Sequence, residues 1–309
     1  MYSTNVGRGT LAGRDGKDAR RRTWVLGGGG ARGAAQVGVL LALFEAGVTP
    51  PERLIGVSVG ALNAVVIAAY PSLAGAHMLR EIWLSKPVAD VFRGHPLSLL
   101  MTRMRTQGIS VLPARNVARV IDRSVELTGT ETFEQLKVPL QVVATNLHAG
   151  TSRVFDSGPL RLALQASTAI PGVFPSVDID GHGYLDGGII DNLPISLAAD
   201  SGAREILAIS LMAGGEVDRL PGNWAELLAR TLQLALHHRA LSDFERLKRR
   251  VRLLLLCPVL KPEQGLDMQR AHIEEMIEAA RQATTQLLQD AGRTLFGSSA
   301  VHYLKPVGG

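Results

Sequence analysis

Residues 24–60 read WVLGGGGARGAAQVGVLLALFEAGVTPPERLIGVSVG. A short apolar run at 24–26 leads into four glycines, and apolar residues then recur at helical spacing through 37–44. A second short apolar run at 54–57 leads through another turn into another helical stretch. Two parallel strands joined by a crossover helix give this order, because parallel neighbours need a long connection. The stretch therefore predicts an α/β fold.

Three later apolar runs extend the same pattern. Residues 140–144, 205–211 and 251–256 predict buried strands separated by helical stretches, which is typical of a mostly parallel sheet covered on both faces. Two long amphipathic helices, at 224–250 and 268–288, are expected to pack on that sheet. We therefore expect an N-terminal arm at 1–22, a core at 23–200, and strands and helices at 201–309 that complete or pack on the same domain.

Composition excludes several classes of protein. The chain has 309 residues, 46% of them hydrophobic, which is enough for a full core. Its single Cys257 forms neither an intrachain disulfide nor a thiolate metal site. Without a secretory signal or a membrane-spanning segment, a cytoplasmic protein with transient, peripheral membrane contact is expected. The net charge of +5 is concentrated at 20–22 and 246–252 without interleaved aromatic residues, which argues against nucleic-acid binding.

The first motif that carries chemistry is the glycine-rich turn at 27–33. Backbone N–H groups at the start of the following helix can face an anion, and the helix dipole favours negative charge there. The turn also matches GxGxxG, but a dinucleotide site needs an acidic residue at the end of the next strand, where Ser58 stands instead. No Lys-Ser/Thr pair follows the glycines, so it is not a Walker loop. Tight binding in a dinucleotide titration would favour the nucleotide alternative.

The second motif is GVSVG at 56–60, placed between a predicted strand and a predicted helix. A serine on such a sharp turn is held exposed as a nucleophile. The flanking Gly56 and Gly60 remove side chains that would crowd the turn, and the helix directs its positive end at developing negative charge. Ser58 is therefore the candidate nucleophile.

The third motif is Asp186-Gly187-Gly188, within the loop-rich stretch 181–194. A carboxylate followed by two glycines can approach another loop closely. An isolated Asp-Gly pair is typical of a reverse turn. In the company of the other two motifs, Asp186 becomes a candidate site residue.

Taken in order, the three motifs resemble those of the patatin-like phospholipase family. The similarity extends through LGGGGARGAAQVGVLLALFEAGV, LIGVSVGALNAVV, VPLQVVATNL and LQASTAIPGVFPSVDIDGHGYLDGGIIDNLPI, and so covers roughly residues 24–199. The resemblance implies a three-layer α/β/α fold. It also implies an enzyme that hydrolyses acyl esters of lipids with a Ser-Asp dyad. Past about residue 200 the resemblance fades.

The resemblance also implies the role of each site residue. Ser58 is the nucleophile and Asp186 is the partner that activates it. Arg32 falls on the basic position beside the oxyanion hole. The oxyanion hole is formed by Gly28, Gly29 and Gly30, and the supporting glycines are Gly33, Gly56, Gly60, Gly187 and Gly188.

The residues favour a dyad on independent grounds. An α/β-hydrolase triad needs Ser, then an acid, then a downstream His. His182 precedes Asp186, and the later histidines lie on predicted helices or in the tail: His237, His238, His272 and His302. Ser58 also follows only one strand–helix unit, whereas a triad elbow follows several strands. We therefore expect acyl transfer through a covalent acyl-enzyme, with no metal and no cofactor.

Several points stay open at this stage. An ordinary Asp is a weak base for a serine, so positioning and oxyanion stabilisation must compensate. A non-catalytic lipid-binding protein and an acyltransferase using the same dyad are alternatives. Product analysis with an added acceptor distinguishes the acyltransferase from the hydrolase.

Residues 88–113 combine apolar side chains with arginines, which suggests either a lid or acyl-chain wall or an ordinary packed helix pair. Pro171 and Pro175 are expected to shape a rigid loop beside Asp186.

Overall fold

The computed structural model describes residues 22–93, 104, 106–107, 110–213, 220–260 and 268–306. The predicted N-terminal arm lies outside the described residues except for Arg22, which begins the first strand. Half of the stretch 88–113, the predicted lid or packed helix pair, also lies outside them. In its described part, Val88, Val91 and Leu112 are buried in the core.

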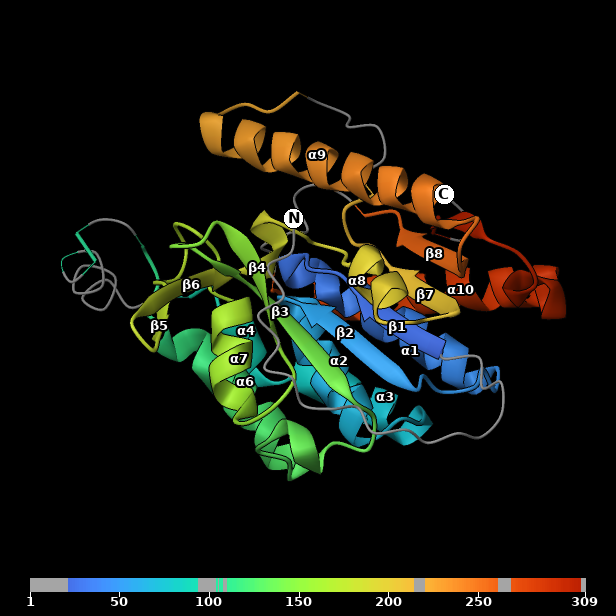
Figure 1. The fold of residues 1–309 in the computed structure, drawn as a ribbon, viewed down its shortest axis with the longest axis horizontal. Helices are drawn as coiled ribbons and strands as arrows, with labels where there is room; N and C mark the ends of the chain where they lie inside the picture. The colour runs from blue at the N-terminus through green and yellow to red at the C-terminus, as the bar shows by residue number, and fades with distance from the viewer. Residues whose placement is uncertain are drawn as a thin grey trace.

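The centre of the molecule is a mixed sheet of nine strands within the described residues (Figure 1). Five pairings are parallel and link β3, β2, β1, β7, β8 and β9 in that spatial order. At one edge β4 and β6 pair antiparallel with β3, and β5 pairs antiparallel with β6. The strands are β1 (Arg22–Leu26), β2 (Arg53–Val57), β3 (Leu140–Asn146), β4 (Thr151–Phe155), β5 (Val177–Ile179), β6 (His182–Asp186), β7 (Glu205–Ile209), β8 (Arg252–Pro258) and β9 (Ala300–Leu304).

Helices cover both faces of this sheet, in unequal numbers. One apolar core joins the sheet to α1 (Gly33–Glu45), α2 (Val59–Ala69), α3 (Leu73–Trp83), α4 (Lys86–Ala89), α6 (Arg115–Thr128), α7 (Leu160–Ser167) and α10 (Arg270–Ala291). The second core joins the opposite face to α8 (Ile195–Asp200) and α9 (Trp224–Leu247). The result is the expected three-layer α/β/α architecture (Figure 1).

Strand alternation explains why the two cores are separate. In β1, Trp24 and Leu26 enter the first core, whereas Val25 enters the second. Successive side chains of a strand point to opposite faces of a sheet, so a strand that is apolar at every position must be covered on both sides. This is the reason that the central strands show as continuous apolar runs in the sequence.

The structure refines the predicted boundaries. The apolar runs become β3, β7 and β8, and the two long helices become α9 and α10. Two segments differ from expectation: the stretch 181–194 contains β6, so Asp186 ends a strand, and His302 lies in β9. Backbone pairing with β3 and β8 fixes these segments as strands, although their sequences are short and partly polar. Within the described residues, no helix is long and apolar enough to cross a membrane.

Candidate active site

The sheet register brings the three sequence motifs to one place. Leu26 of β1 pairs with Gly56 of β2, so the glycine-rich turn and the Ser58 turn leave the sheet side by side. Val57 pairs with Val143 of β3, and the next residue of β3, Ala144, lies opposite Asp186 of β6. The carboxyl ends of neighbouring parallel strands meet at one edge, which is where α/β folds place ligands.

Ser58 occupies a strained turn between β2 and α2. Its φ of 54° and ψ of −129° fall in a region that residues other than glycine rarely adopt. The Ser58 N–H donates to Ser167 Oγ at 2.8 Å, and the Ser167 hydroxyl donates to the Val143 carbonyl at 2.7 Å. The last residue of α7 therefore ties the turn to β3. Behind Ser58, the Gly60 backbone lies so close to β1 that an added Cβ would stand 2.1 Å from the Leu26 oxygen.

Asp186 is buried and fixed by its backbone on both sides. Its N–H donates to the Ala169 carbonyl at 3.0 Å, and its carbonyl accepts from Thr145 Oγ1 at 2.9 Å. Burial raises the pKa of its carboxyl to about 6, while hydrogen bonds from the Ser58 hydroxyl and the Gly188 N–H partly oppose that rise. The Gly188 bond reaches Oδ1 at 2.8 Å. The Ser58 hydroxyl thus lies near enough to the Asp186 carboxyl to lower its pKa, and with a pKa of about 6 the carboxyl is a stronger base than an exposed Asp.

The glycine-rich turn is fixed by Asn192, which follows the Asp-Gly-Gly motif in the chain. The Gly28 N–H donates to the Asn192 carbonyl at 3.3 Å, and Asn192 Nδ2 donates to the Gly28 carbonyl at 3.2 Å. Because C=O and N–H point in opposite directions across a planar trans peptide, the Gly29 N–H points away from Asn192. The Gly29 carbonyl accepts a hydrogen bond from the Arg32 N–H at 3.3 Å. By the same geometry, the Gly30 N–H points away from Arg32. Of the three predicted donors, Gly28 is therefore already engaged.

A chain of buried side chains holds the other side of this turn. Gln36 of α1 donates to the Gly27 carbonyl at 2.8 Å. Asn63 of α2 donates to Gln36 Oε1 at 2.9 Å and accepts from Trp83 Nε1 of α3 at 2.9 Å. Three helices are thus connected to one peptide group of the turn.

The remaining predicted site residues surround the Ser58 and Asp186 turns. Arg32 is buried at the end of a short 3-10 turn, Gly30–Arg32, directly before α1. Five glycines make close backbone or side-chain approaches: Gly33 to Val59, Gly56 to Ala61, Gly60 to Leu26, Gly187 to Val143, and Gly188 to Asn192. An apolar cavity of about 50 Å³ begins at Val59 and is lined by α2, α3, α4 and α6.

Other features lie away from this place. A cavity of about 830 Å³ opens at the opposite end of the strands, where Glu205 pairs with both Arg22 and Arg252. His237 Nε2 lies 3.3 Å from the Tyr303 hydroxyl, and His182 Nδ1 lies 3.0 Å from the Asp180 carbonyl. Within the described residues, no group of three or more His, Cys, Asp or Glu side chains could hold a metal ion.

Sequence reasoning did not single out Asn192, Ser167 or Gln36. Ser167 and Asn192 act on backbone groups 109 and 164 residues away in the chain, and Gln36 acts on the Gly27 carbonyl nine residues before it, so no local pattern marks these contacts. Pro171 and Pro175 flank Phe174, which is buried and stacks on Phe92 with ring centroids 6.1 Å apart. The loop before β5 is thus packed onto the core, and its rigidity stays a prediction.

Comparison with known proteins gives a consistent set of similarities. A sequence model described as patatin-like phospholipase matches residues 24–199. An uncharacterized NTE family protein of Mycobacterium tuberculosis is 34% identical over 224 residues, which cover 71% of this chain and 57% of that protein. The patatin-like phospholipase domain-containing protein 7 of Rattus norvegicus is 32% identical over 196 residues, or 63% of this chain and 14% of that protein. Among solved structures, VipD from Legionella pneumophila has a TM-score of 0.47 and 17% identity, over 88% of this chain and 67% of that one.

Proposed function

Since the chain belongs to the patatin-like phospholipase family, we propose that it is a serine-dependent lipid acyl hydrolase that cleaves carboxylic esters with a Ser58–Asp186 dyad. It spans just over half the length of the mycobacterial relative and a seventh of the rat one, so the activity is argued from its own residues. The observation that carries the proposal is the position of the buried Asp186 carboxyl next to the Ser58 hydroxyl, which lies near enough to lower the pKa of that carboxyl against the effect of burial.

The first step is attack by Ser58. Asp186 accepts the hydroxyl proton as the Ser58 oxygen forms a bond to the ester carbonyl carbon. The raised pKa of Asp186, about 6, supports this role because it lessens the mismatch between carboxylate and serine. The strained turn holds the nucleophile in one orientation, so little order is lost when the substrate binds.

The second requirement is stabilisation of the oxyanion. We assign this role to the N–H groups of Gly29 and Gly30, since the Gly28 N–H is bonded to Asn192. The positive end of α2, directly after Ser58, adds to the same field. Loss of one oxyanion donor typically raises a barrier by about 3 kcal/mol, so these two peptides carry a large share of catalysis.

Collapse of the tetrahedral intermediate expels the alcohol, which takes the proton from Asp186 and leaves Ser58 acylated. Water then attacks the acyl-enzyme with Asp186 as base, and Ser58 is regenerated with release of the fatty acid. The side chains that follow Ser58 around Val59 are mostly apolar, and this supports an acyl group as the part of the substrate bound next to Ser58, although the cavity of about 50 Å³ must widen to admit a chain.

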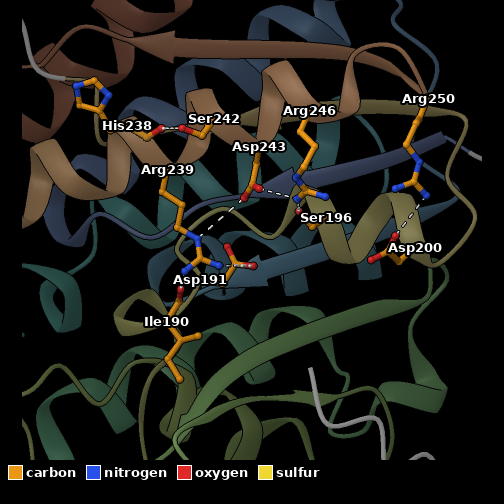
Figure 2. Close-up of polar contacts among 10 residues, drawn as sticks. All are labelled: Ile190, Asp191, Ser196, Asp200, His238, Arg239, Ser242, Asp243, Arg246 and Arg250. Atoms are coloured by element: carbon orange, nitrogen blue, oxygen red, sulfur yellow. Dashed lines mark hydrogen bonds and ion pairs between the residues drawn. The ribbon is translucent and has the colours of Figure 1, made fainter. Parts of the chain in front are cut away.

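Hydrolysis of a p-nitrophenyl ester series and of phospholipid vesicles tests the proposal. We expect Ser58→Ala and Asp186→Asn to lose about 10³-fold or more in kcat while remaining folded. Matched controls are Ser242→Ala and Asp200→Asn, which change exposed side chains on α9 and α8 (Figure 2). Full activity in Ser58→Ala, or equal losses in the control variants, would show the assignment to be wrong.

A further inference from the structure

The buried apolar side chains that anchor helix α9 to the body of the protein lie in its C-terminal part. Ala240, Phe244 and Leu247 are buried in the second core. Arg246 donates to Ser196 of α8 at 2.7 Å, and Figure 2 shows this contact together with the other polar links beneath the helix. Of the side chains that the structure describes in the N-terminal half, from 226 on, none belongs to either core, and Figure 1 shows α9 on the outside of the molecule.

That N-terminal half presents leucines to the outside. Leu227, Leu228, Leu232 and Leu234 are 57%, 60%, 51% and 44% exposed, and we refer to these four residues as the leucine face. At 100° per residue they share one side of the helix. Gln233, which is only 3% exposed, lies on the opposite side. The usual arrangement of a surface helix, apolar inward and polar outward, is therefore reversed here.

The exposed apolar surface is concentrated in this region. Of the eleven large apolar side chains that are exposed in the described part of the chain, five lie between Leu220 and Leu234. Soluble proteins rarely expose contiguous apolar surface without a binding role. A partner for this face is thus expected.

Charge indicates which partner. No Asp or Glu occurs between Leu227 and Leu241, whereas His238 is exposed beside the leucine face. Past the helix end, three exposed basic residues follow: Lys248, Arg249 and Arg250. The whole chain carries a formal charge of +5. Beyond the leucine face both signs occur, and Lys248 and Arg250 pair with Glu245 and Asp200. Within 227–241, however, the apolar strip has basic and no acidic residues, which is the pattern that binds the interface of an anionic bilayer.

Polar contacts connect α9 to the loop that follows Asp186, so the leucine face and the candidate site are linked. Arg239, one turn beyond the leucine face, donates to the Ile190 carbonyl and lies 3.8 Å from the buried Asp191 carboxylate (Figure 2). Ile189, on the same loop and three residues after Asp186, is 44% exposed. The helix is therefore joined to the loop that carries the proposed catalytic acid.

From these observations we propose that the leucine face of α9 docks on the surface of an anionic phospholipid bilayer and brings the Ser58 site to its substrate. The part of this inference that concerns delivery of the Ser58 site to a lipid substrate rests on the proposed function. Its physical basis, the exposed leucines and the basic neighbours, is independent of catalysis. A second copy of this chain, or another protein, is the competing occupant.

Vesicle sedimentation with the full chain tests the docking. We expect binding to phosphatidylcholine vesicles that contain about one-third phosphatidylglycerol, and weaker binding at high salt or to phosphatidylcholine alone. The double variant Leu228→Ser/Leu232→Ser should bind about tenfold more weakly or worse, because two apolar side chains no longer enter the interface. The matched control, Leu147→Ser/Leu162→Ser, changes leucines that are exposed on other elements and should bind as the wild type does.

A site-specific probe adds a second readout. Burial raises the pKa of the Cys257 thiol to about 12, so a dye will react selectively with a cysteine placed on the surface. An environment-sensitive dye on Leu228→Cys should shift to the blue when vesicles are added, and the same dye on Leu147→Cys should not.

Hydrolysis of a soluble short-chain ester separates the two proposals. The leucine double variant should keep wild-type rates on that ester and lose activity only on vesicles. If the wild type cleaves the ester but does not sediment with vesicles, the docking inference fails and the proposed function stands. If it sediments but cleaves nothing, the reverse holds. Equal vesicle binding by both double variants, or a solution dimer that only the leucine variant dissociates, would overturn the bilayer as occupant.

Discussion

Ser58 combines backbone strain with a full set of supporting bonds. A non-glycine residue at φ 54° and ψ −129° costs on the order of 1–3 kcal/mol. Such strain persists only where the surroundings fix the conformation. Here the Ser58 carbonyl accepts from the Ala61 N–H at 2.9 Å, and the Ser58 N–H is held by Ser167. The strain is thus maintained by α2 and α7 together.

The raised pKa of Asp186 predicts how activity depends on pH. Only the ionised carboxyl can accept the Ser58 proton, and burial places its pKa at about 6. We expect kcat/KM for a non-ionising ester to rise about tenfold per pH unit below pH 6 and to level off above it. Stopped-time assays from pH 4.5 to 8.5 measure this profile. An inflection near pH 4, the ordinary value for Asp, would contradict the prediction.

The same shift predicts a stability effect of Asp186→Asn. The folded-state pKa of Asp186 lies above 3.8, the ordinary value for an aspartate, so the folded protein favours the protonated acid. That stabilisation is present below about pH 4 and is lost as pH rises through about 6. At pH 8 the ionised carboxyl costs about 3 kcal/mol, at about 1.4 kcal/mol per pKa unit. Asp186→Asn should therefore be more stable than the wild type at pH 8 and equal to it at pH 4.

Urea unfolding at both pH values checks this expectation, with Asp200→Asn as the exposed control. A destabilised Asp186→Asn at pH 8 would show that the hydrogen bonds to the carboxylate outweigh its desolvation. If Asp186→Asn is more stable at pH 8, the ionised Asp186 carboxyl lowers the stability of the wild type, as is common for residues kept for activity.

Asn192 offers a separate test of the oxyanion assignment. Removing its side chain in Asn192→Ala frees the Gly28 carbonyl and lets the following peptide rotate. We expect kcat to fall by about 10- to 100-fold with KM nearly unchanged, a smaller loss than removal of an oxyanion donor itself. The pH profile should keep its inflection near 6, since Asp186 is untouched. An effect on KM alone would instead indicate a role in substrate binding.

The motifs predicted which residues would lie together. Ser58, Asp186 and the glycine-rich turn meet as expected because strand register brings three chain segments to one edge. Their catalytic roles remain predictions. Asn192 and Ser167 were not predictable, since their partners are the backbone of Gly28 and Ser58, and no sequence pattern records a contact with a distant main-chain group.

At the scale of elements, Gly38 lets α1 and α10 approach closely. An added Cβ would lie 2.0 Å from the Ile277 carbonyl oxygen of α10. Helix propensity alone would make Gly38→Ala stabilising by about 1 kcal/mol. We expect the opposite, a loss of about 2 kcal/mol or more, because two helix backbones must move apart. Chemical denaturation measures the difference, and Gly183→Ala, whose Cβ would make ordinary contacts, is the control. A stabilised Gly38→Ala would contradict the observed crossing.

The success of strand prediction varied with burial. Central parallel strands such as β8 are apolar at nearly every position and were recognised from the sequence. The antiparallel edge was not: β5 (Val177–Ile179) and β6 (His182–Asp186) are short and partly exposed, and each contains polar residues. Their strand conformation comes from pairing with β3 and with each other, which is a tertiary effect.

At the scale of the whole molecule, the sheet extends further along the chain than the match to the family model does. The match to the family model ends at residue 199, yet β7 lies directly beside β1 and continues the sheet into β8 and β9. Helix α10, further along the same segment, packs on α1 in the first core. The second core contains residues from both sides of residue 200, including Ala199 and Ile206. The sequence predicts that residues 201–309 complete or pack on the same domain as 23–200, and from these contacts we expect the two parts to unfold as one cooperative unit.

Truncation tests whether residues 201–309 are needed for the rest of the chain to fold. A chain ending at residue 200 would leave β1, whose residues Trp24 to Leu26 are fully buried, as a sheet edge in water. Exposed apolar edges promote aggregation, and the loss of α10 would uncover α1 as well. We therefore expect residues 1–200 alone to show no cooperative thermal transition. Co-expression with residues 201–309 should restore a folded complex, because the missing strands are then supplied in trans. A truncated chain that melts cooperatively near the temperature of the full protein would instead identify 23–200 as a domain in its own right.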